Sequence, residues 1–235
     1  MNLLLQEDLE RPSEGFDSIF LRNAREKTME VCAEIPKLLK AGMTERDAKR
    51  VVMECFAERG VKKHWHRTYV RFGAGTCRTF NEPEETEETL KENDPVYFDV
   101  GPIWPKEVLG SVGELDYEGD YGNSFVFLGN RAPPVLEFGR ELFEHGRSRW
   151  ITGQVTGAQL YVELSQLALK SGYSLHPRVR GHRLSDFPHQ KYTKATLGEL
   201  PFVPGDGRWV LEVHLIDPQL NRGAFFEDLL LKDFQ

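Results

Sequence analysis

The sequence predicts an α+β fold made of two similar halves around a central site. Two segments with the apolar periodicity of amphipathic helices, 44–60 and 156–172, each begin at a threonine and end at a glycine sixteen residues later. Both are followed by strand-like segments that carry metal-ligand residue types. Two such helices, offset by 112 residues, can match by chance, but an internal duplication gains weight because strands with ligand-type residues follow each copy. Two halves of this kind would bring acidic side chains face to face.

Periodicity and turn residues predict the other elements in order. Residues 17–40 have helical periodicity and end before Gly42. Thr44 is a suitable N-cap for the next helix, because its hydroxyl can accept from free amides of the first turn. A further helix is expected at 135–146. Strands rich in β-branched and aromatic residues are expected at 67–72, 96–100, 124–128 and around two later glutamates, at 212 and 227.

Length and composition favour one domain and exclude several classes of protein. A chain of 235 residues with 40% hydrophobic content can bury one large core, expected here over residues 18–235 after a leader of residues 1–17. The net charge of -7 and the lack of basic runs argue against nucleic acid as a partner. No apolar stretch reaches membrane-spanning length, and the acidic N-terminal segment is unlike a secretory signal, so a cytoplasmic protein without membrane partners is expected. Three cysteines are too few for a disulfide framework.

Five residues of metal-ligand type occur in strand-like or turn contexts. They are Asp99, Asp120, His182, Glu212 and Glu227. An acid inside an apolar strand needs a partner, because burying an unpaired carboxylate is costly. Four carboxylates and one imidazole suit a pair of hard-to-borderline divalent cations. The pattern therefore predicts a shared two-metal site.

The sequence around these residues resembles a known family. The segments, in chain order, are NDPVYFDVGPIW, EGDYGNSFVFLG, GHRLSDFPH, EVHLID and GAFFEDLLL. They are similar to motifs of the pita-bread metallopeptidase superfamily, which includes methionine aminopeptidase, aminopeptidase P, prolidase and creatinase. The resemblance runs from about Ser18 to the C-terminus. It implies the pita-bread fold, without the separate N-terminal domain of the prolidase and creatinase type.

The resemblance also implies roles for the five residues. Asp120 and Glu227 would bridge two metals, Asp99 would chelate one, and His182 and Glu212 would complete the other. Mn²⁺, Fe²⁺ or Co²⁺ is favoured over Zn²⁺ because the site is rich in oxygen and has no thiolate.

The activity implied is that of a metal-dependent, aminopeptidase-like hydrolase. Metal-activated water would cleave a peptide or amide-like C–N bond of a short peptide or small molecule. His189 would be the catalytic histidine and would help the developing oxyanion or position the substrate.

One departure from the family concerns histidine. Family peptidases carry another histidine shortly before the first metal aspartate, and alignment on Gly73 places Phe80 or Thr79 there. His64 and His66, in the preceding HWHR segment, either reach the site instead or pair with nearby acids and pack against Trp65.

Two further departures concern an apparent insertion and the strand of Glu212. The apparent insertion, residues 104–116, sets Asp99 and Asp120 twenty-one residues apart. It would be a surface hairpin or loop, a substrate lid or a subunit contact. The strand of Glu212 fits the family after a one-residue shift. His214 would share a face with Glu212, as an additional ligand, a supporting donor or a buried histidine bonded to a neighbour.

Two further expectations concern the substrate site. Arg183, beside His182, would hold a substrate carboxylate or neutralise nearby acids. A homodimer would supply a missing wall of the site.

Other functions considered are a small-molecule reaction at the same metals, oxygen-dependent if iron is bound, and a non-catalytic interaction module. Four converging carboxylates argue against the module, because they repel one another without cations.

Overall fold

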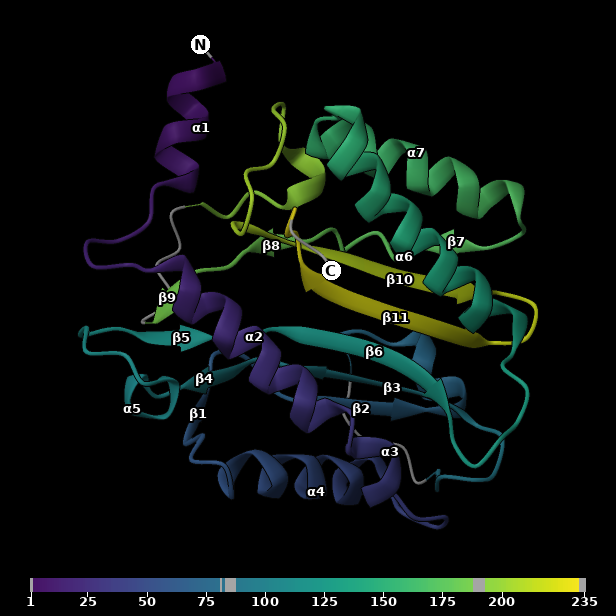
Figure 1. Cartoon of the computed structure of the whole chain (residues 1–235). Helices are drawn as coiled ribbons and strands as arrows, with labels where there is room; N and C mark the ends of the chain where they lie inside the picture. Colours follow the sequence, from purple (N-terminus) through teal and green to yellow (C-terminus); the bar gives the residue numbers. More distant parts are fainter. Residues whose placement is uncertain (1, 81, 83–87, 188–192, 233–235) are drawn as a thin grey trace.

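The computed structural model describes residues 2–80, 82, 88–187 and 193–232 (Figure 1). The helices are α1 (Asn2–Glu10), α2 (Ser18–Cys32), α3 (Ile35–Leu38), α4 (Glu45–Ala57), α5 (Lys106–Leu109), α6 (Pro134–Gly153) and α7 (Gly157–Lys170), with 3₁₀ turns η1 (Gly73–Cys77) and η2 (Leu197–Glu199). The strands are β1 (Lys63–His64), β2 (Tyr69–Phe72), β3 (Pro95–Val100), β4 (Pro102–Trp104), β5 (Asp116–Glu118), β6 (Tyr121–Val126), β7 (Ser174–Leu175), β8 (His182–Arg183), β9 (Asp186–Phe187), β10 (Trp209–Asp217) and β11 (Arg222–Leu229).

A seven-stranded antiparallel sheet joins the two predicted halves. Its order is β2-β3-β6-β11-β10-β7, and β8 also pairs with β10. Helices α2 and α4 lie along the β2-β3-β6 part of the sheet, and α6 and α7 cover β10 and β11 (Figure 1). Two hydrophobic clusters fill these two halves.

Strand alternation separates a helix-covered face from a polar one. In β3, Val96, Phe98 and Val100 enter the core cluster under α2 and α4, whereas Tyr97 and Asp99 project from the opposite face. Strands β10 and β11 alternate in the same way, with apolar side chains toward α6 and α7. Polar groups on the open face can therefore meet without disturbing either core.

The duplicated helix starts are confirmed in atomic detail. The Thr44 hydroxyl accepts from the amide of Asp47, whose side chain accepts in return from the amide of Thr44. Thr156 and Gln159 form the same reciprocal cap at α7. Each cap satisfies amides that the first turn leaves free.

Several predicted boundaries were wrong for local reasons. The helix expected over 17–40 is broken after Cys32 into α2 and α3, because Pro36 lacks the amide hydrogen that a continuous helix would use. The helix expected at 135–146 continues to Gly153. The strand expected at 124–128 lies at 121–126, and Leu128, with φ of 48°, cannot continue an extended strand.

The predicted leader contains helix α1, which is tied to the sheet by polar contacts. Glu10 accepts from the indole of Trp209 and from the amide of Gly205, both at 2.7 Å. Arg183 donates to the carbonyl oxygens of Leu9 and Glu10 at 3.1 Å. The end of α1 is thus bonded to residues that surround the open face.

The apparent insertion, residues 104–116, forms the connection of a hairpin in a small second sheet. Strands β4 and β5 form a hairpin within the order β1-β4-β5-β9, and α5 lies in its loop. Trp104 is buried, and its indole donates to the hydroxyl of Thr28 at 2.8 Å. Pairing of β1 with β4 holds the segment that precedes His66.

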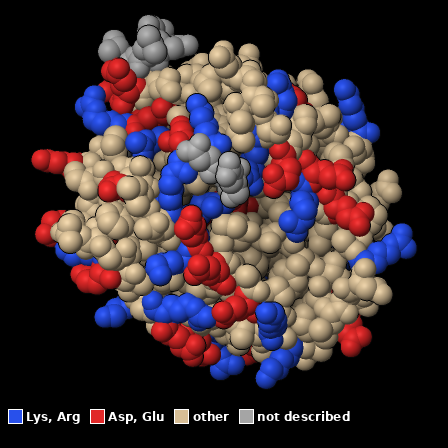
Figure 2. Space-filling model, in the orientation of Figure 1, with Lys and Arg blue, Asp and Glu red and all other residues tan. Residues whose placement is uncertain are grey.

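The charged surface is mixed in sign. Basic and acidic side chains are interspersed on the face in Figure 2. Among the described residues, no helix is both long and apolar enough to cross a membrane.

A buried ion pair links α2 to β11. Two guanidinium nitrogens of Arg25, Nε and Nη2, donate to the two Asp228 carboxylate oxygens at 2.6 Å. We expect Arg25→Met to lower the free energy of unfolding by about 3–5 kcal/mol, because Asp228 would keep a buried charge without its partner. Urea unfolding measures this change. The exposed pair of Arg11 and Asp8 provides the control, and Arg11→Met should change the value by less than about 1 kcal/mol. Equal effects of the two variants would contradict this account.

Candidate metal centre

One row of paired residues crosses the large sheet and defines the site. Tyr69 pairs with Asp99, Asp99 with Gly122, Gly122 with Glu227, and Glu227 with Glu212. Directly paired residues project to the same face of a sheet, so three acids lie on the open face. A Cβ at Gly122 would lie 2.3 Å from the Phe225 ring and 3.0 Å from the Glu227 Cβ. A side chain at this position of the row would therefore displace its neighbours.

Asp120 and His182 join the row from its neighbouring residues. Asp120 lies two residues before Gly122, and His182 pairs with Val210, two residues before Glu212. His182 Nε2 lies 2.9 Å from Asp120 Oδ2 and 3.2 Å from Glu227 Oε1. Both halves thus contribute to one cluster, as the duplication predicts.

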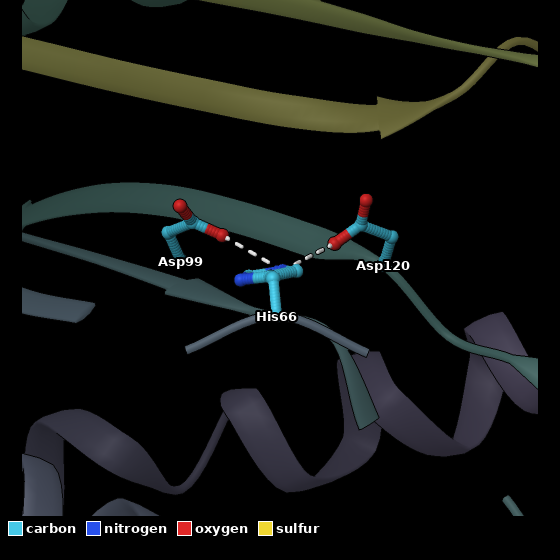
Figure 3. A group of neighbouring side chains, drawn as sticks. All are labelled: His66, Asp99 and Asp120. Carbon is cyan, nitrogen blue, oxygen red and sulfur yellow. Dashed lines mark hydrogen bonds and ion pairs between the residues drawn. The ribbon is translucent and has the colours of Figure 1, made fainter. Parts of the chain in front are cut away.

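A second imidazole, that of His66, completes the cluster. Its Nε2 lies 3.1 Å from Asp120 Oδ1 and 3.4 Å from Asp99 Oδ1 (Figure 3). Its Nδ1 donates to the carbonyl of Arg67 at 2.7 Å. Asp120 therefore presents one carboxylate oxygen to each of the two histidines.

Hydrogen bonds also hold Glu212. Its Oε2 accepts from the amide of Gly181 at 2.7 Å, and the Tyr161 hydroxyl donates to its backbone carbonyl at the same distance. One oxygen of the neighbouring Glu227, Oε2, is buried and has no hydrogen-bond partner among the described residues. An unpartnered buried carboxylate oxygen is what a cation would satisfy.

Crowding shifts the protonation of the cluster. Burial, together with repulsion from Asp120 and Glu212, raises the pKa of Asp99 to about 7. Burial also favours the neutral form of Asp120, but hydrogen bonds from His182 and His66 outweigh it and lower the pKa of that carboxyl. Although burial opposes the imidazolium, Asp99 and Asp120 raise the pKa of His66 to about 9. These shifts favour a protonated His66 imidazole beside a charged Asp120 carboxylate.

Two ligand groups in the cluster could each hold a metal ion. They are His66 with Asp99 and Asp120, and Asp120 with His182 and Glu227. Within each group the ligand atoms lie within 4.8 Å of one another. The shared member, Asp120, is fully buried, so one carboxylate could serve two cations.

A cavity of about 440 Å³ opens beside the cluster. Trp65, Tyr69 and Phe80 form an aromatic part of its lining, and Arg178 and Lys194 contribute positive charge. The Tyr69 hydroxyl donates to the carbonyl of Phe80 at 2.7 Å, which holds Phe80 at the cavity. Phe80, one of the two residues aligned with the family histidine, therefore lines the cavity.

Two other histidines named from the sequence lie away from the cluster. The His64 ring packs edge-on against Phe56 and contacts the Thr68 hydroxyl at 3.4 Å. His214 shares the open face with Glu212, but its Nε2 donates to the carbonyl of Thr76 at 2.8 Å. Of the two histidines of the HWHR segment, the structure brings only His66 to the acids.

The structure describes one of two further predicted site residues, Arg183, but not the other, His189. The Arg183 guanidinium donates to the carbonyls of Leu9, Glu10, Leu184 and Arg208, and is thus committed to backbone groups rather than to a substrate carboxylate. His189 lies outside the described residues.

Three residues that shape the site are not assigned to it from the sequence, which predicts Trp65 only as a packing partner of the histidines. The Trp65 ring lies 4.5 Å from the His66 ring and 5.0 Å from the His182 ring. Tyr161 supports Glu212 from α7, and Gly101 leaves room for the His66 ring. The HWH pattern could have indicated Trp65, whereas Tyr161 resembles any other core position of an amphipathic helix.

Comparison with known proteins agrees with this geometry. Residues 20–231 match the sequence profile of metallopeptidase family M24. The chain belongs to this family. A comparison of this M24 protein with curated sequences gives no match.

Solved structures confirm the predicted pita-bread fold. The chain is similar to a prolidase from Thermococcus sibiricus (TM-score 0.72, 17% identity), with 97% of this chain and 59% of that chain covered. It is also similar to an X-Pro aminopeptidase from Thermotoga maritima MSB8 (TM-score 0.72, 13% identity), with 100% and 66% covered. A third match is an Xaa-Pro dipeptidase from Bacillus anthracis (TM-score 0.70, 14% identity), with 99% and 64% covered. The M24 chain thus spans about 59 to 66% of these structures.

Buried His214 predicts acid sensitivity that is independent of metal. Burial lowers the pKa of His214 to about 4, below the value of about 6.5 in an unfolded chain. The unfolded state then binds more protons between these values, so the stabilisation is complete above about pH 6.5 and is lost as the pH falls toward 4. We expect His214→Gln, which keeps a donor for Thr76, to remove up to about 3 kcal/mol of this pH dependence.

The measurement is urea unfolding with chelator at pH 7 and at acidic pH. The wild type, measured in parallel, provides the reference. Parallel loss of stability in the wild type and His214→Gln would contradict the assignment.

Proposed function

We propose that the protein is a dinuclear metal-dependent hydrolase that cleaves a peptide or amide-like C–N bond in a short peptide or small substrate. The observation that carries the proposal is the pair of ligand groups that share Asp120 beside a cavity. Membership of family M24 supports the same reaction class.

In this proposal each ligand has a defined task. Asp120 and Glu227 bridge two cations, Asp99 binds one of them, and His182 and Glu212 bind the other. The charges fit, because four ionised carboxylates with two neutral histidines would balance the charge of two divalent cations. Mn²⁺, Fe²⁺ and Co²⁺ suit the oxygen-rich ligand set better than Zn²⁺.

When bound, a pair of divalent cations lowers the pKa of a water molecule and polarises a substrate carbonyl. The protein's part is binding and orientation. The aromatic lining, with Trp65 and Tyr69, excludes water from the reacting bond, and Arg178 and Lys194 attract a substrate carboxylate. The Gly181 amide fixes the Glu212 carboxylate in one orientation. His189 is proposed to donate a hydrogen bond to the developing oxyanion.

One observation favours a second candidate function. Phe80, which lines the cavity, and Thr79 are the two residues aligned with the family histidine that contacts the substrate amide. A small-molecule reaction at the same metals, oxygen-dependent with iron, would not need that contact. Oxygen consumption by Fe²⁺-loaded protein without peptide cleavage would favour this candidate.

Metal analysis and peptide assays test the main proposal. Protein purified without added metal should bind two Mn²⁺, Fe²⁺ or Co²⁺ ions and cleave members of a short-peptide panel that includes Xaa-Pro substrates. Asp120→Asn should lower turnover by at least about 100-fold and remove bound metal, because the shared ligand loses its charge. The exposed acid in the control variant Asp8→Asn lies outside the cluster, so this variant should retain both properties. Metal-independent activity, or full activity in Asp120→Asn, would contradict the proposal.

A further inference from the structure

We propose that His66 is a sixth metal ligand, which binds the cation held by Asp99 and Asp120, so that each of the two cations receives one imidazole. This inference rests on the proposed dinuclear site. It adds a nitrogen ligand to the set of four carboxylates and one histidine implied by the sequence motifs.

The spacing of the ligand atoms supports it. Two ligands bonded at about 2.1 Å to one metal lie about 3.0 Å apart at an octahedral right angle and about 3.4 Å apart at a tetrahedral angle. His66 Nε2 lies 3.1 and 3.4 Å from its two aspartate oxygens. The corresponding distances of His182 Nε2, already assigned to the other cation, are 2.9 and 3.2 Å. The two imidazoles are therefore spaced in the same way from their acids.

The orientation of the two rings is also the same. Nδ1 of His66 donates to the carbonyl of Arg67, and Nδ1 of His182 donates to the carbonyl of Arg183. If a cation displaces the Nε2 proton, a ring held in this way directs its Nε2 lone pair toward the place between the two carboxylates. Histidine ligands of metals commonly donate their other ring nitrogen to a backbone carbonyl.

The backbone at Gly101 leaves the space that the His66 ring occupies. A Cβ at Gly101 would lie 2.4 Å from His66 Cδ2 and 2.5 Å from its Nε2, so glycine is needed there. The amide of Trp65 donates to the carbonyl of Gly101 at 3.0 Å, and β1 pairs with β4 just before this point. The apparent insertion and the histidine are thus parts of one structure.

A second nitrogen ligand changes the metals that the site prefers. Imidazole suits Fe²⁺ and Co²⁺ better than Mn²⁺, for which carboxylates suffice. We expect His66→Gln to weaken Co²⁺ binding by at least about tenfold and to weaken Mn²⁺ binding less. Competition with a chromophoric chelator measures both affinities.

Proton NMR of the Co²⁺-loaded protein tests the ligand directly. Each histidine bound to Co²⁺ through Nε2 gives one hyperfine-shifted, exchangeable Nδ1–H signal. The wild type should show two such signals, one lost in His66→Gln and the other in His182→Gln. His64→Gln, changed two residues earlier in the chain, should keep both. Because the wild-type count is itself a result, the test does not depend on the variants folding.

The outcomes separate this inference from the proposed function. Two bound Co²⁺ ions with a single shifted signal, lost only in His182→Gln, would overturn the role of His66 and leave the dinuclear hydrolase standing. Failure of the wild type to bind Co²⁺ would overturn the sixth ligand, and failure to bind Mn²⁺ and Fe²⁺ as well would overturn the dinuclear hydrolase too. Two signals and a selective loss of Co²⁺ affinity in His66→Gln would establish the sixth ligand.

Discussion

The fold has to hold several negatively charged side chains close together on one face of its large sheet. Four carboxylates meet on one face of the large sheet, and Asp120 and Glu227 are almost completely buried there. Mutual repulsion and lost hydration would drive such groups apart. Two helix-covered cores hold the strands that carry them, so packing energy keeps the acids together whether or not cations are bound. The same crowding gives a cation its affinity for the site.

The sequence was sufficient to predict the acids and His182, because these residues belong to local motifs in a recognisable order. It also predicted the helix starts at Thr44 and Thr156, where the cap is formed with the residue three positions later. It could not determine which histidine of the HWHR segment meets the acids. That choice depends on the pairing of β1 with β4, which joins residues about forty positions apart in the chain. The partners of Arg183 in α1 are more distant still.

The second sheet positions the chain segment that brings His66 to the site. Strands β4 and β5 occupy the stretch that separates Asp99 from Asp120, and their hairpin holds the chain that leads to His66. Phe80 also lines the cavity, and His66 brings a second imidazole to the acids. A second imidazole alters the chemistry offered to a substrate while the scaffold is kept.

Assembly of the site also depends on correct strand register along the row from Tyr69 to Glu212. Side chains alternate between the faces of a strand, so a slip of one residue in any hairpin of the row would turn an acid into a hydrophobic core and an apolar side chain into the cavity. Misregistered chains could keep their secondary structure, but they could not assemble the ligand groups. Cations would then bind only correctly registered molecules and withdraw them from the folding equilibrium. Metal supply during synthesis would in this way govern how much of the chain reaches its native register.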